Sequence, residues 1–125
     1  MVAMCDVVVA SDRSTFSTPG VNLGFFCSTP GVAVARAVPA KTAAYMLYTG
    51  LPLTADEALA AGLVSRVVPV DRLDEETDCV VESIRRKSRP VIRLGKKFLK
   101  HQVKLDVLDA YRYGSLGFLG VLTHF

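Results

Sequence analysis

The side chains able to do nucleophilic or metal chemistry are few and far apart in this chain. Three cysteines (Cys5, Cys27 and Cys79) and two histidines (His101 and His124) are present, and no two of them stand at CxxC, metal-ligand or triad spacing. Cys27 is a possible nucleophile, but an isolated thiol more often serves as a small apolar side chain. The sequence therefore predicts no metal site, and we expect both histidines at the surface.

Carboxylates could act as general acids or bases, yet the two nearest candidates have structural explanations. Asp6 stands beside a predicted strand, where an Asp more often forms a cap or turn. Glu57 follows Thr54 by three positions, so that Thr54-Ala-Asp-Glu57 forms a capping box. The pattern predicts a helix start, and it leaves no carboxylate for acid–base catalysis.

Composition limits the chain to one domain or part of one, because domains usually contain roughly 100–200 residues and this chain has 125. Half of the residues are hydrophobic and 22% are charged, which excludes a disordered chain. So apolar a composition predicts that some apolar surface meets a partner. The odd, scattered cysteines fit a reducing compartment.

The net charge of +3 is unevenly placed, because nine of the fifteen Lys and Arg residues lie between Arg85 and Lys104. A solvated helical face is favoured over a binding surface. Nucleic-acid binding ranks last, since only Phe98 brings an aromatic ring into this stretch. Residues 1–10 lack the basic flank of a targeting segment. Residues 115–125 are about half as long as the roughly 20 residues of a membrane span, so none is expected.

The local pattern predicts alternating short strands and helices in the first half. Val7–Ala10 and Thr15–Ser17 indicate strands, and Pro19-Gly20 indicates a turn in which the glycine could need a positive φ. The apolar spacing from Val32 to Leu47 predicts two short helices separated at Pro39. Gly50 is expected to end the second of them.

The second half is predicted to be mostly helical. After the capping box, the helix should stop at Gly62, and Leu63–Val68 indicates a strand. Asp71 is a candidate N-cap for the next helix, and Pro90 suits the first turn of the one after it. We expect the apolar stripes of these helices to be core or subunit-interface positions.

Two blocks of sequence resemble one known family. The first contains Met4-Cys5-Asp6 and, further on, Pro19-Gly20-Val-Asn-Leu23-Gly24; the second runs from Thr49 to Val70. The second combines a tight turn, a capped helix and a glycine-stopped return to a strand. Together they resemble the crotonase (enoyl-CoA hydratase/isomerase) family over residues 2–114. The resemblance implies an α/β fold, the C-terminal part of a crotonase-like ββα spiral with its helical trimerisation region. It divides the chain into a partial domain (1–114) and a divergent apolar tail (115–125).

The resemblance also implies which chemistry to look for. Enzymes of this family bind an acyl-CoA thioester and stabilise an enolate-like oxyanion with two backbone N–H groups, and the hydratases add two glutamates for proton transfer. One glutamate would directly follow Pro19, where this chain has Gly20. The other glutamate and the first oxyanion donor would fall upstream of Met1. The resemblance thus implies no catalytic residue and no cofactor here, and it places Pro19, Gly20 and Leu23 beside the acyl chain.

Two functions follow as hypotheses. The first is an acyl-CoA-handling protein of fatty-acid metabolism, mitochondrial by resemblance, whose hydration chemistry is lost in this chain. The second is a non-catalytic oligomerisation or interaction fragment, because the family assembles as trimers or dimers of trimers through its C-terminal helices. Because no carboxylate stands at the expected acid–base positions, the interaction hypothesis is favoured for this chain. The acyl-CoA hypothesis is favoured for a longer parent protein. Gly20 stays open between a simple turn residue and an active site reshaped for another reaction.

Overall fold

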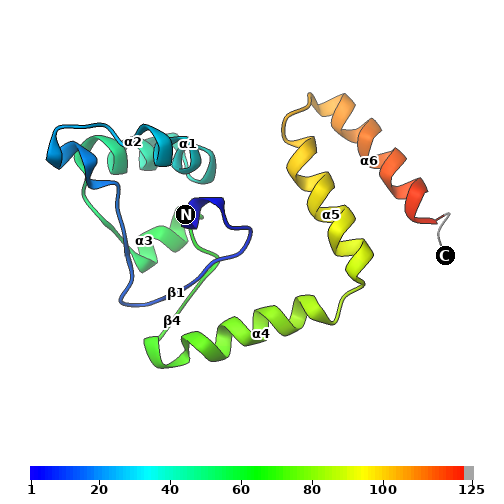
Figure 1. The fold of residues 1–125 in the computed structure, drawn as a ribbon, viewed down its shortest axis with the longest axis horizontal. Helices are drawn as coiled ribbons and strands as arrows, with labels where there is room; N and C mark the ends of the chain where they lie inside the picture. Colours follow the sequence, from blue (N-terminus) through cyan, green and yellow to red (C-terminus); the bar gives the residue numbers. More distant parts are fainter. Residues whose placement is uncertain (123–125) are drawn as a thin grey trace. The chain divides into compact units, whose positions relative to one another are not determined.

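A computed structural model describes residues 1–122 and divides the chain into two compact units, with the boundary after Asp78 (Figure 1). His124 lies outside the described residues. The first unit contains, in chain order, η1 (Val2–Met4), β1 (Val9–Ser11), β2 (Thr15–Phe16), η2 (Pro19–Leu23), α1 (Ser28–Ala37), α2 (Ala40–Thr49), β3 (Leu53–Thr54), α3 (Ala55–Ala60), β4 (Arg66–Val68) and η3 (Val70–Arg72). Helix α4 (Leu73–Arg85) crosses the boundary, and α5 (Arg89–Gln102) and α6 (Val107–Leu122) follow.

Two small strand pairs organise the first unit. β1 and β4 are parallel, with Val9 opposite Arg66 and Ser11 opposite Val68, whereas β2 and β3 are antiparallel. A parallel pair needs a long crossover connection. Here the crossover contains α1, α2 and α3, so these helices are tied to the strands from both ends (Figure 1).

The core of the first unit is built mainly from small and medium-sized side chains. Ala58 of α3 is completely buried, and Met46 of α2 is the largest side chain with almost no exposure. Around them pack the other buried members of the cluster, Ala10, Val34, Val38, Ala43, Leu53, Leu63 and Val64. In the same unit, the turn η2 packs against helix α2.

Local signals for helix ends are confirmed. Pro39 stands at the N-cap of α2, directly after the extended residue Val38 that ends α1. Gly50 ends α2 in the left-handed conformation (φ 67°), and Gly62 adopts a similar φ of 77° after α3. The capping box is present in full: the Thr54 N–H donates to Glu57 Oε2 (2.8 Å), and the Glu57 N–H donates to Thr54 Oγ1 (3.2 Å).

Three local predictions need correction. Gly20 has no positive φ; within the described residues that conformation belongs to Gly24, Gly50 and Gly62. Asp71 does not cap α4, because it lies inside the 3-10 turn η3 and the α-helix begins at Leu73. The strand expected at Leu63–Val68 is confined to Arg66–Val68, since Leu63 and Val64 turn into the core instead.

The second unit contains an antiparallel hairpin of α5 and α6 (Figure 1). Pro90 occupies the first turn of α5, as predicted. Phe98 of α5 stacks on Tyr113 of α6 with ring centroids 5.8 Å apart, and His101 lies 4.7 Å from the same ring. Gly114 permits this contact, because a Cβ there would lie 3.2 Å from the Phe98 ring. Helix α6 continues through residues 115–122, which belong to the predicted tail.

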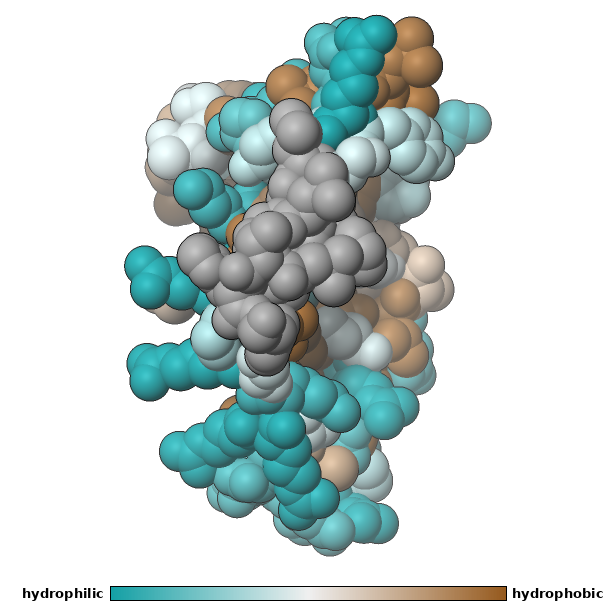
Figure 2. Space-filling model, turned by 90° about the vertical axis from the view of Figure 1, so that its right-hand side faces the viewer, coloured by the Kyte–Doolittle hydropathy of each residue, from teal (hydrophilic) through white to brown (hydrophobic). Residues whose placement is uncertain are grey.

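The surface mixes strongly hydrophilic and hydrophobic residues. On the side shown in Figure 2, long hydrophilic side chains project into solvent beside exposed hydrophobic ones. Among the described residues, no helix combines the length and hydrophobicity needed to cross a bilayer.

Candidate functional site

The turn η2 is held in place by helix α2. Thr18, just before the turn, is buried, and its Oγ1 donates a hydrogen bond to the carbonyl oxygen of Met46 (2.9 Å). Gly50 adds a second close contact, because a Cβ there would lie 3.0 Å from the Asn22 side chain. The turn that carries the predicted site residues is therefore fixed at both ends against one helix.

Gly20 is buried and closely surrounded. Its N–H donates to the Sγ of Cys27 (3.3 Å), and its carbonyl oxygen accepts from the N–H of Phe25 (3.2 Å). A Cβ on Gly20 would lie 2.5 Å from Cys27 Sγ, 2.8 Å from a ring carbon of Phe25 and 2.9 Å from the Phe25 carbonyl oxygen. These distances are too short for any side chain without movement of residues 25–27. Position 20 therefore requires glycine because Cys27 and Phe25 approach it closely, and not because of its φ angle.

The other two predicted site residues lie at the surface. Pro19 is exposed, and Leu23 is 76% exposed. The structure thus brings Pro19, Gly20 and Leu23 together on one short turn, with only the backbone of Gly20 facing its neighbours.

Two aromatic residues beside this turn were not predicted as part of the site. Phe25 and Phe26 are both at least half exposed, and the Phe26 ring lies 6.1 Å from the Tyr48 ring of α2. The sequence contains one signal that could have indicated them. Two adjacent aromatic residues stand directly after Gly24, and Gly24 reverses the chain in the left-handed conformation. With Leu23 they form an apolar surface, here called the η2 surface (Leu23, Phe25, Phe26 and Tyr48).

Glu57 is not available as a proton donor near neutral pH. Its carboxylate accepts hydrogen bonds from the backbone and hydroxyl of Thr54, and these bonds lower the pKa of Glu57 from its ordinary 4.5. The capping role predicted from the sequence accounts for both of its interactions.

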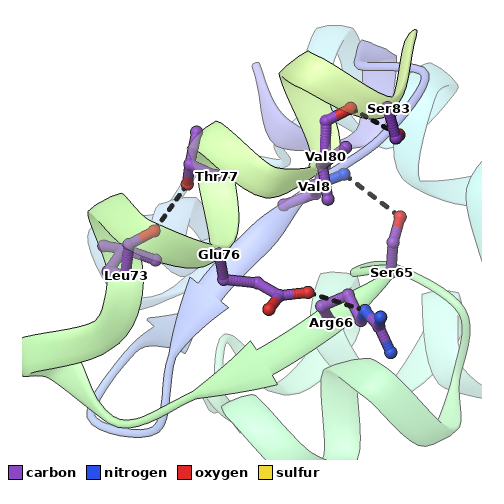
Figure 3. A network of polar contacts seen from close by, with 8 residues as sticks. All are labelled: Val8, Ser65, Arg66, Leu73, Glu76, Thr77, Val80 and Ser83. Atoms are coloured by element: carbon purple, nitrogen blue, oxygen red, sulfur yellow. Dashed lines mark hydrogen bonds and ion pairs between the residues drawn. The ribbon is translucent and has the colours of Figure 1, made fainter. Parts of the chain in front are cut away.

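Polar contacts near β4 are also used for structure (Figure 3). The Val8 N–H donates to Ser65 Oγ (3.1 Å), and Arg66 Nε lies 3.0 Å from Glu76 Oε1. Thr77 Oγ1 donates to the Leu73 carbonyl oxygen within α4. The ion pair between Arg66 and Glu76 fixes the start of α4 against the strand.

Metal-ligating and nucleophilic residues do not converge in the described part of the chain. No group of three or more His, Cys, Asp or Glu side chains in residues 1–122 is arranged to hold a metal ion. Cys27 is half-buried beside Gly20, whereas Cys5 and Cys79 are exposed. His101 is exposed and contacts Tyr113, so its predicted surface position is confirmed.

The sequence model of one family, described as enoyl-CoA hydratase/isomerase, matches residues 1–124. The chain belongs to this family. As an enoyl-CoA hydratase/isomerase family member, it is 56% identical over 111 residues to human enoyl-CoA hydratase domain-containing protein 3, mitochondrial, covering 89% of this chain and 37% of that protein. It is 51% identical over 115 residues to the protein of the same name from Xenopus laevis, covering 92% of this chain and 39% of that one.

Solved structures of the enoyl-CoA hydratase/isomerase family confirm the predicted crotonase fold. The crystal structure of human enoyl coenzyme A hydratase domain-containing protein 3 superposes with a TM-score of 0.95 at 52% identity, covering 98% of this chain and 48% of that one. An enoyl-CoA hydratase from Mycobacterium smegmatis gives a TM-score of 0.95 at 40% identity, covering 97% and 47% of the two chains. This chain spans less than half the length of these relatives.

Proposed function

We propose that this chain forms the C-terminal part of an acyl-CoA-handling domain of fatty-acid metabolism, and that the 125-residue polypeptide does not hydrate enoyl thioesters. Family membership over residues 1–124 supports the acyl-CoA substrate class. Several relatives carry the word mitochondrial in their names, which supports a mitochondrial location for this chain within the same proposal.

The environment of Gly20 carries the proposal. Adding water to an enoyl thioester requires groups that transfer protons to and from carbon and water. The position where the family resemblance expects a glutamate is Gly20, and the space for its side chain is filled by Cys27 and Phe25. The chain contains no Asp or Glu between Asp12 and Asp56, a range that includes the whole η2 surface. This segment therefore contains no carboxylate that could replace the missing one.

The η2 surface supports a binding role for the same turn. Leu23, Phe25 and Phe26 expose apolar side chains, and apolar surface of this kind suits an acyl chain. Within the proposal, Pro19 and Leu23 contact the acyl chain. Gly20 contributes close backbone packing alone, because its N–H is directed to Cys27 Sγ.

A second candidate function is non-catalytic assembly through the helical region. Helices α4, α5 and α6 and the turn after α5 expose many large apolar side chains, including Val81, Ile84, Leu99, Val103 and Leu108. Exposed apolar surface of this extent favours burial against another protein surface. Within this proposal the chain joins a homo-oligomer, a trimer or a dimer of trimers.

The catalytic part is tested by building a complete domain. The upstream part of a related, active domain is joined to this chain in two versions: one keeps Gly20, and the other carries Gly20→Glu with Cys27→Ala and Phe25→Ala to make room. Both are assayed with crotonyl-CoA by loss of the enoyl thioester absorbance, beside the 125-residue chain. We expect no activity in the 125-residue chain and a glutamate version at least about 100-fold faster than the Gly20 version, since a positioned general acid or base contributes about 10²–10⁴-fold to the rate.

Two outcomes would overturn the proposal. If the version that keeps Gly20 folds, binds CoA and hydrates crotonyl-CoA as fast as the glutamate version, the acid–base position is wrongly assigned. If the 125-residue chain hydrates the substrate alone, the loss of activity is wrong. Sedimentation velocity tests the second candidate function, assembly through the helical region. A chain that stays monomeric up to high concentration would contradict it.

A further inference from the structure

The short connection between α4 and α5 is basic and ends in a serine. Helix α4 ends at Arg85 and α5 begins at Arg89. The connection between them is Arg86-Lys87-Ser88, so arginine stands at both the second and the third position before the serine. No other Ser or Thr in the 125-residue sequence has basic residues at both of these positions. The charge pattern therefore distinguishes one hydroxyl of the chain from all the others.

Two arginines before a hydroxyl form a charge pattern that basophilic serine/threonine kinases recognise. Charge patterns of this kind contribute to the choice of substrate by kinases. Arginine suits this recognition because its planar guanidinium forms two parallel hydrogen bonds with one carboxylate. The sequence around Ser88 thus fits a kinase whose substrate groove is lined by acidic side chains.

The connection is open to solvent, and the helix end beside it is weakly held. Every residue from 81 to 90 is exposed. Arg85 forms an ion pair with Glu82 over 2.9 Å, and ion pairs between exposed side chains contribute little to stability. Because helix ends also fray, the last turn of α4 can open and let residues 85–88 enter a kinase groove in an extended form.

The cations also keep this connection in water if the chain assembles through its helices. Four of the five residues from Arg85 to Arg89 are cations. Burying charged groups without partners is costly. We therefore expect an apolar interface formed by α4, α5 and α6 to leave the connection exposed to solvent.

The Ser88 side chain has no structural task that a modification would disturb. Ser88 is the N-cap residue of α5, yet its side chain makes no capping hydrogen bond. Its carbonyl oxygen alone joins the helix, by accepting from the Ile92 N–H (3.0 Å). The N–H groups of Arg89 and Val91 belong to the first turn, where no intrahelical partner exists. A phosphate on Ser88 would meet these groups and the positive end of the helix dipole.

We propose that Ser88 is a phosphorylation site for a basophilic serine/threonine kinase, and that the phosphate stabilises the first turn of α5. In the reaction, Ser88 Oγ forms a bond to the γ-phosphorus of ATP while the bond from that phosphorus to the bridging oxygen of ADP breaks. ADP leaves, and the hydroxyl proton passes to the catalytic carboxylate of the kinase. The phosphate adds a charge of about −1.5 to −2 beside the neighbouring cations. The proposal holds whether or not the chain binds acyl-CoA.

The test treats the full 125-residue chain with ATP, Mg²⁺ and the catalytic subunit of cyclic-AMP-dependent protein kinase. Mass spectrometry locates the phosphate, and phosphate incorporation gives the rate. Ser88→Ala removes the acceptor, and Arg85→Ala with Arg86→Ala removes the arginine pair. The matched control, Lys97→Ala with Lys104→Ala, makes the same change of net charge outside the site. Circular dichroism verifies that each variant keeps its helices.

We expect one phosphate, at Ser88, and none in the Ser88→Ala variant. Loss of the arginine pair should slow phosphorylation at least about tenfold, because two charge-assisted contacts with the kinase are lost. The control should change the rate less than about twofold, through net charge alone. Equal rates for the two double variants, or a phosphate at another residue, would overturn the proposal.

A synthetic peptide of residues 83–93 tests whether the folded chain leaves the site open. The chain should react within about tenfold of the peptide rate, since fraying helix ends open at little cost. Urea unfolding should then show a higher midpoint for the phosphorylated chain than for the unmodified one. Ser88→Ala should leave the midpoint nearly unchanged, because the hydroxyl makes no capping bond. Reaction of the peptide alone, reaction of neither, or a midpoint lowered by phosphorylation would each contradict the proposal.

Discussion

The amide of Gly20 donates a hydrogen bond to Cys27 Sγ over 3.3 Å, and a Cβ on Gly20 would stand only 2.5 Å from that sulfur. The two residues are seven positions apart, and the chain between them reverses at Gly24. One short turn thus closes on itself at the position where the family resemblance expects a glutamate.

Gly20→Ala should destabilise the chain by about 1–3 kcal/mol, because overpacking forces neighbouring groups to move. Urea unfolding measures the change. Combining it with Cys27→Ala should recover part of the loss, since the shortest contact is with the sulfur, while the contact with the Phe25 carbonyl oxygen remains.

The matched glycine for this experiment is Gly95 in α5, where a Cβ would meet nothing within 4 Å. Gly95→Ala should be neutral or stabilising by up to about 1 kcal/mol through helix propensity. Equal destabilisation by the two substitutions would show that crowding at Gly20 is not the cause.

Thr54→Ala should destabilise the chain by about 1 kcal/mol, because the first turn of α3 loses the hydroxyl that accepts from the Glu57 N–H. Thr77→Ala is the control, because the Thr77 hydroxyl bonds only to a carbonyl oxygen of its own helix. We expect the control to change the free energy of unfolding by less than about 0.5 kcal/mol. A Thr54 variant as stable as the control would contradict the importance of the cap.

The capping box should also make stability depend on pH. Hydrogen bonds from Thr54 lower the pKa of Glu57 in the folded state. The contribution of Glu57 is therefore fully present above its ordinary pKa of 4.5 and is lost as the pH falls through the lower folded pKa. The difference in unfolding midpoint between the unmodified chain and Glu57→Gln should shrink on acidification. A difference that stays constant down to strongly acidic pH would contradict this assignment.

The purified chain should associate at moderate concentration, because the η2 surface and the helical region both expose large apolar side chains. Size-exclusion chromatography and dye binding to apolar surface measure this. Phe25→Ser with Phe26→Ser and, separately, Leu99→Ser with Leu108→Ser tell which region is responsible. A monodisperse monomer that unfolds cooperatively would count against both the partial-domain proposal and the assembly proposal.

Local sequence signals predicted where helices α2 and α3 begin and end. The contacts around Gly20 depend instead on tertiary packing. Pro39, Gly50 and the Thr54–Glu57 pair act within a few residues, so the sequence alone locates the breaks around α2 and α3. The crowding at Gly20 depends on how Phe25 and Cys27 fold back after Gly24. No local rule gives that distance.

The strand boundaries also depend partly on local sequence and partly on tertiary pairing. Val7–Ala10 was predicted as a strand and β1 occupies Val9–Ser11, shifted by its pairing with Arg66–Val68. Ser65 ends the pairing because its side chain accepts the Val8 N–H. For the site, the resemblance predicts that Pro19, Gly20 and Leu23 lie beside the acyl chain, and this stays a prediction. The aromatic residues around the turn were recognised only from the structure.

The parallel pairing of β1 with β4 has a consequence for how the chain acquires its structure. Val8 and Ser65, which are bonded at the end of this pair, are 57 positions apart, and joining such distant segments is slow because the loop must first lose entropy. During synthesis the apolar segment around Val8 therefore emerges long before its partner strand exists. The segment stays exposed until Arg66–Val68 leaves the ribosome. A chaperone would therefore be needed most in the interval before β4 appears.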